Sequence, residues 1–303
     1  MGAPAIVIRP MRLDDVAEVE RISGDSFSDL ERRLPVPTGA AATGRDPARS
    51  AQWRRRTEHL LATDPGGCWV AEDPADAGGG VVGFAVSFTR ELMWVLASYG
   101  VRPGLQGRGT GRVLLEAALH HGRGCLRGML ASSPDPAAVR RYRLAGFDLH
   151  PAMLMTGAVD RAALPVLGRI REGTLGDRDL MDSVDRRARG AAHGPDHDVL
   201  HATTARLLVV DRPAGQGYAY LRGSGEPALL AATTVAVARD LAWEALASAP
   251  AGEPGTRIGH LTAANQWAID VGLAAGLALH QRGYLALRRC RPPTPYLHHG
   301  SLL

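Results

Sequence analysis

The chain has 303 residues, of which 45% are hydrophobic and 22% are charged, and its formal net charge at pH 7 is +4. This length and apolar share allow two domains with full hydrophobic cores and exclude a wholly disordered chain. All 35 basic residues are Arg, interleaved with acidic residues, and no apolar stretch reaches the length of a membrane span. We therefore expect neither a nucleic-acid partner nor a membrane partner.

Hydrophobic periodicity predicts an α/β protein. In the first half we predict strands over 5–9, 68–72, 81–89, 93–101 and 126–132, and helices over 13–22, 112–121 and 136–144. A Gly-rich turn over 76–80 joins two of the strands, and the segment 35–50 shows no period. In the second half we predict strands over 206–211, 217–222 and 258–262, a helix over 227–246, and one or two helices within 267–280. Such alternation predicts a sheet with helices on both faces.

A faint internal repeat links the two halves. The pattern Ile-Arg followed by Leu and Asp occurs at positions 8, 9, 13 and 15 and again at 170, 171, 175 and 177. Two Gly-aromatic pairs, at 83–84 and 146–147, have apparent counterparts at 217–218 and 283–284. We therefore expect a duplication, with one domain over 1–158 and a second over 159–303.

Residues 101–111 carry the strongest functional signal, Val-Arg-Pro-Gly-Leu-Gln-Gly-Arg-Gly-Thr-Gly. They lie between a predicted strand and a predicted helix. A Gly-rich turn at a helix N-terminus presents several backbone N–H groups and the positive end of the helix dipole, which suits a pyrophosphate or another anion. The spacing is neither the dinucleotide-binding G-x-G-x-x-G nor a P-loop, since no Lys follows it.

This stretch resembles the coenzyme A pyrophosphate loop of the GCN5-related N-acetyltransferases (GNAT), written V-x-P-x-x-[QR]-G-x-G-x-G/A. Residues 136–147 are similar to a later motif of the family, a helix that carries A-x-x-x-Y and ends in Gly-Phe. The resemblance implies two tandem acetyltransferase-like domains, each a mixed, mostly antiparallel central sheet flanked by helices. It also implies acetyl-CoA as co-substrate and no metal cofactor.

The resemblance further implies roles for individual residues. Tyr142 would be the general acid that protonates the departing thiolate. Glu91, the nearest carboxylate to the strand before the loop, is the candidate general base, with Glu72 a weaker one. The strand backbone would bind the acetyl carbonyl and the pantetheine amides, and Ser132 stands where many relatives have Asn. The cofactor-binding residues would be Tyr99, Gly100, Val101, Gln106, Gly107, Arg108, Gly109, Thr110, Gly111, Arg112 and Ser132.

The second half departs from the motif. The segment 222–227 before its predicted long helix has no Q-x-x-G-x-G, and aligning Gly283 with Gly146 puts Leu279 opposite Tyr142. We expect a degenerate domain that binds coenzyme A poorly or not at all.

Two further features predict what the protein lacks. His193, His197 and His201 are spaced by four, but Gly194 and Pro195 interrupt a helix there. We expect no acid or Cys to complete a ligand set and hence no metal site. The three cysteines lie far apart without C-x-x-C pairing, as is typical of reduced thiols in a cytoplasmic protein.

These features together predict an N-acetyltransferase. It would move an acetyl group from acetyl-CoA to a primary amine of a small molecule or a protein by direct attack in a ternary complex. We expect a monomer or a homodimer. The alternative is a non-catalytic acyl-CoA-binding sensor or a partner-binding module.

Overall fold

The structure is a computed structural model that describes residues 6–34, 45–75, 80–168, 170–251 and 256–303. Most of the predicted turn at 76–80 and most of the irregular segment at 35–50, namely residues 76–79 and 35–44, lie outside these ranges. Two compact units make up the chain, Met1–Leu130 and Ala131–Leu303. The domain boundary expected at 158/159 concerns the duplicated sequence and stays a prediction.

The first unit is built on five neighbouring strands in the order β1-β2-β3-β4-β5. Their pairs are antiparallel from β1 to β4, whereas β4 and β5 run parallel. The strands are β1 (Val7–Pro10), β2 (Cys68–Glu72), β3 (Val81–Arg90), β4 (Met93–Val101) and the start of β5 (Arg127–Ser132), and the helices are α1 (Val16–Arg33), α2 (Pro47–Thr63) and α3 (Thr110–His121).

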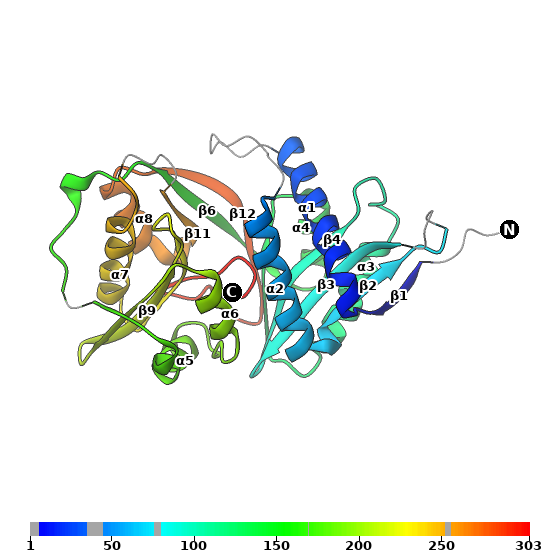
Figure 1. Cartoon of the computed structure of the whole chain (residues 1–303), viewed down its shortest axis with the longest axis horizontal. Coiled ribbons are helices and arrows are strands. Elements are labelled where there is room, and N and C mark those ends of the chain that lie inside the picture. The colour runs from blue at the N-terminus through cyan, green and yellow to red at the C-terminus, as the bar shows by residue number, and fades with distance from the viewer. Residues whose placement is uncertain (1–5, 35–44, 76–79, 169, 252–255) are drawn as a thin grey trace. The chain divides into compact units, whose positions relative to one another are not determined.

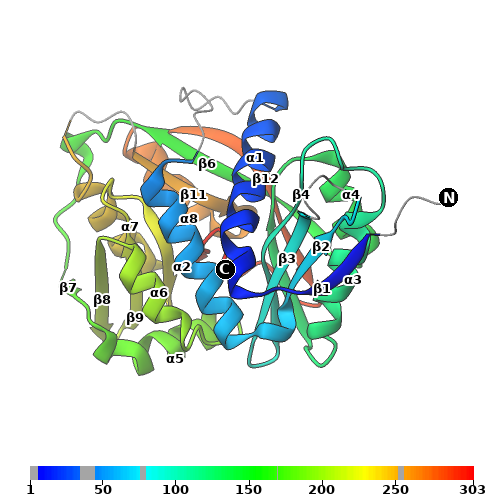
Figure 2. The same ribbon diagram turned by 45° about the vertical axis from the view of Figure 1, so that its right-hand side comes forward.

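Helices cover both faces of this sheet, as predicted (Figures 1 and 2). Alternation along β3 shows how the faces are assigned, because successive side chains of a strand point to opposite sides. A Cβ on Gly83 would meet Leu114 of α3, whereas the ring of the next residue, Phe84, packs edge-on against Trp53 of α2 at 5.9 Å. β3 is therefore buried on both faces and forms the centre of the first core.

An irregularity in β4 leads toward the loop that follows this strand. Val86 pairs with Ser98, but Ser87 pairs with Leu96, so Ala97 is an extra residue on β4. Such a bulge bends the strand and re-aims its backbone. The ladder between β4 and β5 ends at Leu96 and Leu130. Within the first unit, the last residues of β4 therefore pair only with β3.

The second unit contains two groups of antiparallel strands, β12-β6-β11 and β13-β10-β9-β8-β7. A Cβ on Gly217 of β9 would meet Val237 of α7, whereas Tyr218 donates to Asp185 of α5, so helices again lie on both faces. The elements are α4 (Pro136–Leu144), β6 (Asp148–Gly157), β7 (Arg171–Glu172), α5 (Arg178–Ala188), α6 (Asp196–Thr203), β8 (Arg206–Arg212), β9 (Gly215–Leu221), β10 (Pro227–Ala232), α7 (Val235–Ala247), β11 (Thr256–Thr262), α8 (Gln266–Ala274), β12 (Ala278–Arg288) and β13 (Tyr296–Leu297).

The helix predicted over 227–246 is wrong in its first third. Residues 227–232 form strand β10, paired with β9 on one side and β13 on the other, and α7 begins only at Val235. All six residues of β10 are buried. A short, wholly apolar run has no period that separates a buried strand from a buried helix, so pairing within the sheet decides its conformation.

The repeat at the start of each half is confirmed by local geometry. In the first unit, Arg9 binds both carboxylate oxygens of Asp15 at 2.7 and 2.8 Å, and the same carboxylate accepts from the amide of Arg12. In the second, Arg171 binds both oxygens of Asp177, at 3.0 and 2.5 Å, and that carboxylate accepts from the amide of Thr174. In each unit an Arg and an Asp six positions later form the same doubly hydrogen-bonded ion pair around a short 3-10 turn, which we call the Arg-Asp clasp.

The structural counterpart of Gly146 is Gly276, so the alignment with Gly283 is wrong. After α4, Gly146 has a φ of 86°, and the next amide bonds to the carbonyl of Tyr142 at 3.1 Å. After α8, Gly276 has a φ of 84°, and the next amide bonds to the carbonyl of Gly272 at 2.9 Å. Gly272, and not Leu279, therefore corresponds to Tyr142. The expectation that this half has no equivalent hydroxyl is unchanged.

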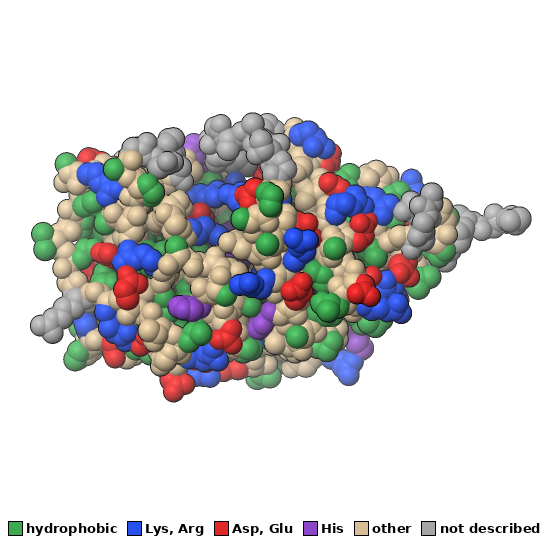
Figure 3. Space-filling view, viewed as in Figure 1, with side chains coloured by type: hydrophobic (Ala, Val, Ile, Leu, Met, Phe, Trp, Pro, Cys, Tyr) green, Lys and Arg blue, Asp and Glu red, His purple; other side chains and the backbone are tan. Residues whose placement is uncertain are grey.

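The surface and the helices agree with the charge and hydropathy patterns of the sequence. Arg side chains are interspersed with Asp and Glu on the face drawn in Figure 3. Among the helices that the structure describes, none has both the length and the apolar character needed to cross a membrane.

Candidate functional site

The Gly-rich loop joins the end of β4 to the start of α3 in the first unit, as the sequence predicts. Gly104, Gly107 and Gly109 have φ angles of 83°, 82° and 92°, which L side chains rarely adopt, and a Cβ on any of them would meet nothing within 4 Å. These glycines are therefore needed for backbone conformation and not for space. Gly109 is the N-cap of α3, and its carbonyl accepts from the amides of Arg112 and Val113.

The backbone N–H groups of the loop are available to an anion. Leu105 donates to the carbonyl of Arg102, but the amides of residues 106–111 have no main-chain acceptor among the residues that the structure describes. Residues 106–108 are exposed. The N-terminus of a twelve-residue helix adds a partial positive charge at this point. This combination of donors and dipole favours a phosphate or diphosphate group.

Hydrogen bonds around Val101 fix the start of the loop. The carbonyl of Val101 accepts from the amide group of Gln106 at 3.1 Å and from the hydroxyl of Ser26 at 3.2 Å. The guanidinium of Arg102 donates to the carbonyl of Val81 at 2.6 Å, so this arginine is used in holding the loop. Ser26 lies 75 positions before its partner, and no sequence pattern marked it.

Tyr99 and Gly111 lie against one another. A Cβ on Gly111 would fall 2.3 Å from the hydroxyl of Tyr99 and 3.6 Å from a methyl group of Val101. The first turn of α3 therefore packs directly on the end of β4, which only glycine at 111 permits. Of the predicted cofactor-binding residues, the structure brings ten together here: Tyr99, Gly100, Val101, Gln106, Gly107, Arg108, Gly109, Thr110, Gly111 and Arg112.

Two arginines provide positive charge at the same place. Arg108 and Arg112 are exposed beside the N-terminus of α3, and Arg112 reaches Glu116 only at 3.9 Å. An ion pair this long between exposed groups is weak, so both guanidinium groups can turn to a bound phosphate.

The two candidate bases lie at opposite ends of the sheet. Glu91 is an exposed residue in the turn between β3 and β4, with a φ of 51°. β4 separates it from the loop by nine residues, roughly 30 Å of extended chain. Glu72 pairs with Val81, whose carbonyl accepts from Arg102 at the start of the loop, so Glu72 lies at the loop end of the sheet. Its carboxylate binds Arg9 at 2.5 Å, and this hydrogen bond lowers the pKa of the Glu72 carboxyl.

Tyr142 and Ser132 belong to the second unit. Asp135 caps α4 by accepting from the amides of Ala137 and Ala138, and Tyr142 is buried on this helix, 5% exposed. Ser132 ends β5, and its hydroxyl donates to the carbonyl of Ser133 at 2.8 Å. Tyr142 is thus a buried phenol, a group that can act as a proton donor.

A buried ion network in the first unit was not foreseen. The Asp64 carboxylate accepts from Arg90 at 2.7 Å and from the amide of Thr89 at 2.8 Å, and it lies 3.4 Å from His121. Burial alone would raise the pKa of the Asp64 carboxyl, but these hydrogen bonds outweigh it and hold the pKa well below its ordinary value. The network joins the ends of α2, β3 and α3, and its members lie too far apart in the sequence to form a motif.

The expectation that no acid accompanies the histidines at 193 and 197 is wrong. Gly194 and Pro195 do interrupt the helix, since α6 begins at Asp196. Asp182 and Asp185 of the preceding helix α5 nevertheless lie beside the two imidazoles. His201 is exposed and takes no part in this group.

Comparison with known proteins agrees with this assembly. The model of the acetyltransferase (GNAT) family matches residues 31–147. No curated protein sequence matches the chain. The chain is similar to a solved structure of a candidate acetyltransferase from Pyrococcus horikoshii, with 17% identity, a TM-score of 0.73, and coverage of 98% of this chain and 95% of that one.

Two further solved structures are described as GCN5-related N-acetyltransferases. One, from Kribbella flavida, has 16% identity and a TM-score of 0.59 over 93% of this chain and 70% of the other. The second, from Sphaerobacter thermophilus, has 13% identity and a TM-score of 0.56 over 96% and 98%. Identities this low show a common fold alone. Residues 31–147 therefore match the acetyltransferase (GNAT) family model, and the chain shares its fold along nearly its whole length with solved structures described as acetyltransferases.

Proposed function

We propose that the protein is an acetyl-CoA-dependent N-acetyltransferase that acts on a primary amine. The observation that carries the proposal is the set of unpaired, exposed amides at residues 106–108, continued by the start of α3 and flanked by Arg108 and Arg112. In this proposal the amides bind the diphosphate of coenzyme A, and the two arginines add charge-assisted hydrogen bonds.

The backbone of β4 supports the binding of the pantetheine arm. From Ser98 to Val101, the strand pairs only with β3 within the first unit, because its ladder to β5 ends at Leu96. An extended amide chain adds to such an edge by main-chain hydrogen bonds. N–H groups held in this way would also stabilise the negative charge that develops on the thioester oxygen.

The reaction that we propose is direct transfer in a ternary complex. The substrate ammonium loses one proton to water, its nitrogen attacks the thioester carbon to form a tetrahedral intermediate, and the nitrogen then loses a second proton to water. The carbon–sulfur bond then breaks, and the thiolate takes a proton from the hydroxyl of Tyr142, which solvent later replaces. We assign no side chain as the base, since Glu91 lies at the far end of β4 and the carboxylate of Glu72 is bound by Arg9. A relayed water is the alternative.

Calorimetry and a turnover assay test the proposal together. Coenzyme A and acetyl-CoA are titrated into the full chain, and release of free thiol is followed with a panel of small amines and N-terminal peptides. We expect saturable binding, turnover with at least one amine, and a fall of about 100-fold in kcat for Tyr142→Phe at unchanged coenzyme A affinity. Absence of coenzyme A binding would refute the proposal. Tight binding with no turnover on any amine would favour the acyl-CoA sensor instead.

A further inference from the structure

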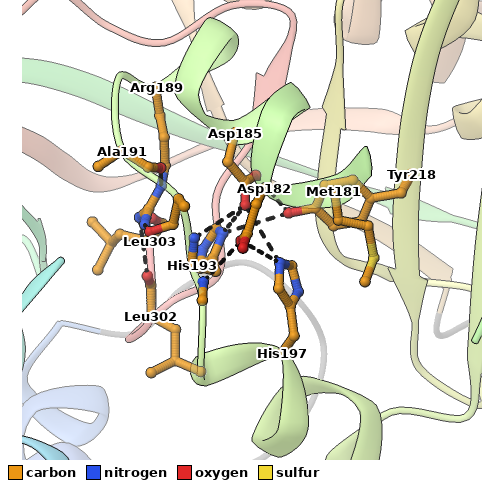
Figure 4. Close-up of polar contacts among 12 residues, drawn as sticks. Met181, Asp182, Asp185, Arg189, Ala191, His193, His197, Tyr218, Leu302 and Leu303 are labelled. Atoms are coloured by element: carbon orange, nitrogen blue, oxygen red, sulfur yellow. Dashed lines mark hydrogen bonds and ion pairs between the residues drawn. The ribbon is translucent and has the colours of Figure 1, made fainter. Parts of the chain in front are cut away.

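Two histidines and two aspartates converge within the second unit (Figure 4). Nδ1 of His193 lies 2.7 Å from Oδ2 of Asp185. Nε2 of His197 lies 3.2 Å from Oδ1 of Asp182 and 3.6 Å from Oδ2 of Asp185. The side chains of Asp185, His193 and His197 are 0% exposed, and that of Asp182 is 14% exposed.

The local backbone fixes this arrangement. Asp182 and Asp185 are three residues apart on α5, so they project from one face of the helix. The connection that follows turns back over this face, with Gly194 at a φ of 56°. The amide of His193 donates to Asp185 at 3.2 Å, and that of Gly194 donates to Asp182 at 2.9 Å. His197 then enters from the first turn of α6.

Carboxylates and imidazoles face one another in this group. The guanidinium of Arg189 donates to the main-chain oxygens of Ala191, Ala192, Leu302 and Leu303. A buried carboxylate is costly unless a positive charge or a metal ion compensates it. An ion placed between the carboxylates and the imidazoles would provide that compensation.

The polar atoms lie close enough together to bind one ion, since one ligand atom each of Asp185, His193 and His197 lies within 4.8 Å of the other two. With metal–ligand bonds of about 2.0–2.2 Å, neighbouring ligand atoms of a tetrahedral zinc site lie about 3.3 Å apart. Nε2 of His197 lies 3.2 and 3.6 Å from the two carboxylates, close to that value, whereas Nδ1 of His193 and Oδ2 of Asp185 are at hydrogen-bond distance, 2.7 Å. Nε2 of His197 faces both carboxylates without a well-aligned hydrogen bond to either. Nε2 of His197 therefore points between the two carboxylates and not at a single oxygen.

Hydrogen bonds behind the ligand atoms complete the pattern. Tyr218 donates its hydroxyl hydrogen to the second oxygen of Asp185 at 2.6 Å. The hydroxyl of Tyr220 lies 3.3 Å from Nδ1 of His197. Metal ligands are usually oriented by such outer contacts, which leave one lone pair of each ligand aimed at the ion.

We propose that Asp182, Asp185, His193 and His197 bind one divalent transition metal ion, with Zn²⁺ the ion that fits this donor set best. Imidazole nitrogens combined with carboxylate oxygens are a donor set typical of zinc. Ligand atoms of Asp185, His193 and His197 all lie within 4.8 Å of one another, and Asp182, 3.2 Å from Nε2 of His197, would complete the set by a movement of its side chain. Four protein ligands would make the site structural rather than catalytic. The inference goes beyond the proposed acetyl transfer, which does not use this group.

Metal binding by the purified full chain is the test. The protein is stripped with a chelator, and its zinc content, Zn²⁺ affinity and melting temperature are measured with zinc sulfate alone. Co²⁺ serves as a second probe, because its visible absorption reports four-coordinate geometry. We expect one Zn²⁺ per chain, a higher melting temperature with Zn²⁺, and an affinity weaker by about tenfold or more in His197→Gln and in Asp182→Asn.

His201→Gln is the matched control, because it removes an exposed imidazole from the same helix. This variant should bind Zn²⁺ like the wild type. Asp182→Asn changes a partly exposed position, so it provides a folded variant if His197→Gln does not fold. Substoichiometric binding to the wild type, or equal affinity in both ligand variants, would overturn the inference. Coenzyme A binding is measured on the same samples, so its failure and that of the metal site are separable.

Discussion

Replacement of Gly109 tests the diphosphate loop most directly. A Cβ at this position meets nothing within 4 Å, but the φ of 92° is unfavourable for L residues. Gly109→Ala should therefore cost about 1–2 kcal/mol in the bound conformation, a strain that the unbound loop can relieve. At 1.4 kcal/mol per tenfold change, this weakens coenzyme A binding by about fivefold to thirtyfold.

Gly109→Asp adds electrostatic repulsion to the same strain. A carboxylate about 5 Å from one phosphate charge costs about 3 kcal/mol at an effective dielectric constant of about 20. We therefore expect an affinity roughly 100-fold below that of Gly109→Ala. Isothermal titration with coenzyme A at two salt concentrations measures both effects. Added salt should narrow the gap between the two variants, because screening acts on the charge and not on the strain.

Gly124→Asp is the control for net charge. Gly124 is exposed just past the other end of α3, and a Cβ there meets nothing within 4 Å. The helix of twelve residues is about 18 Å long, which exceeds the Debye length of about 8 Å at physiological ionic strength. Binding to this variant should match that of the wild type. If Gly109→Asp binds coenzyme A as tightly as Gly124→Asp does, the loop is not the diphosphate site.

Three further predictions concern residues away from the loop. Glu91→Gln should leave kcat/KM within about twofold of the wild-type value, since Glu91 lies at the end of β4 away from the loop. A larger loss of kcat/KM, with an alkaline shift in the pH–rate profile, would restore Glu91 as the candidate base. Asp64→Asn should lower the free energy of unfolding by about 3 kcal/mol at pH 7, because it removes the carboxylate that binds the buried guanidinium of Arg90. Urea denaturation measures this change. The pKa of Asp64 is depressed in the folded state, so its contribution is present above the unfolded pKa of about 3.9 and is lost as pH falls; the gap between wild type and variant should close in acid. Gly283→Ala should lower the free energy of unfolding by about 3 kcal/mol, because the φ is 70° and the Cβ would lie 2.1 Å from the carbonyl oxygen of Ser132. Gly223→Ala, at a site where a Cβ meets nothing within 4 Å, should leave the free energy of unfolding unchanged. Equal stability of the two variants would contradict this account.

The features that the sequence predicts well are those formed by local interactions. The glycines of the loop have positive φ angles at 104, 107 and 109, as a Gly-rich turn before a helix requires. The Arg-Asp clasp closes within six residues in each unit. In both cases, neighbouring residues determine the conformation, so residue type and spacing are sufficient to predict it.

Predictions failed where tertiary contacts decide between local alternatives. The apolar run 227–232 is compatible with either a helix or a buried strand, and its pairing with β9 selects the strand. The pair Gly283–Tyr284 resembles Gly146–Phe147 by residue type, but Gly283 lies within β12 and closes against Ser132. Only the hydrogen bond that follows α8 identifies Gly276 as the true counterpart. Ser26 and Asp64 act on partners far along the chain, which no local pattern could indicate.

The start of α7 differs from the start of α3 in a way that disfavours a bound anion. The connection from β10 to α7 consists of two threonines, and the hydroxyl of Thr234 accepts from the amide of Val237 at 3.4 Å. The Thr234 hydroxyl thus accepts from a backbone N–H at the start of α7. At the start of α3 the N-cap residue is Gly109, which has no side chain to accept from the corresponding N–H groups. Thr234 has an extended backbone, with a φ of −139°, so no left-handed glycine turn precedes the helix. The two halves share the order of their first four strands but differ in how they satisfy a helix N-terminus, and we expect that difference to disfavour anion binding at α7.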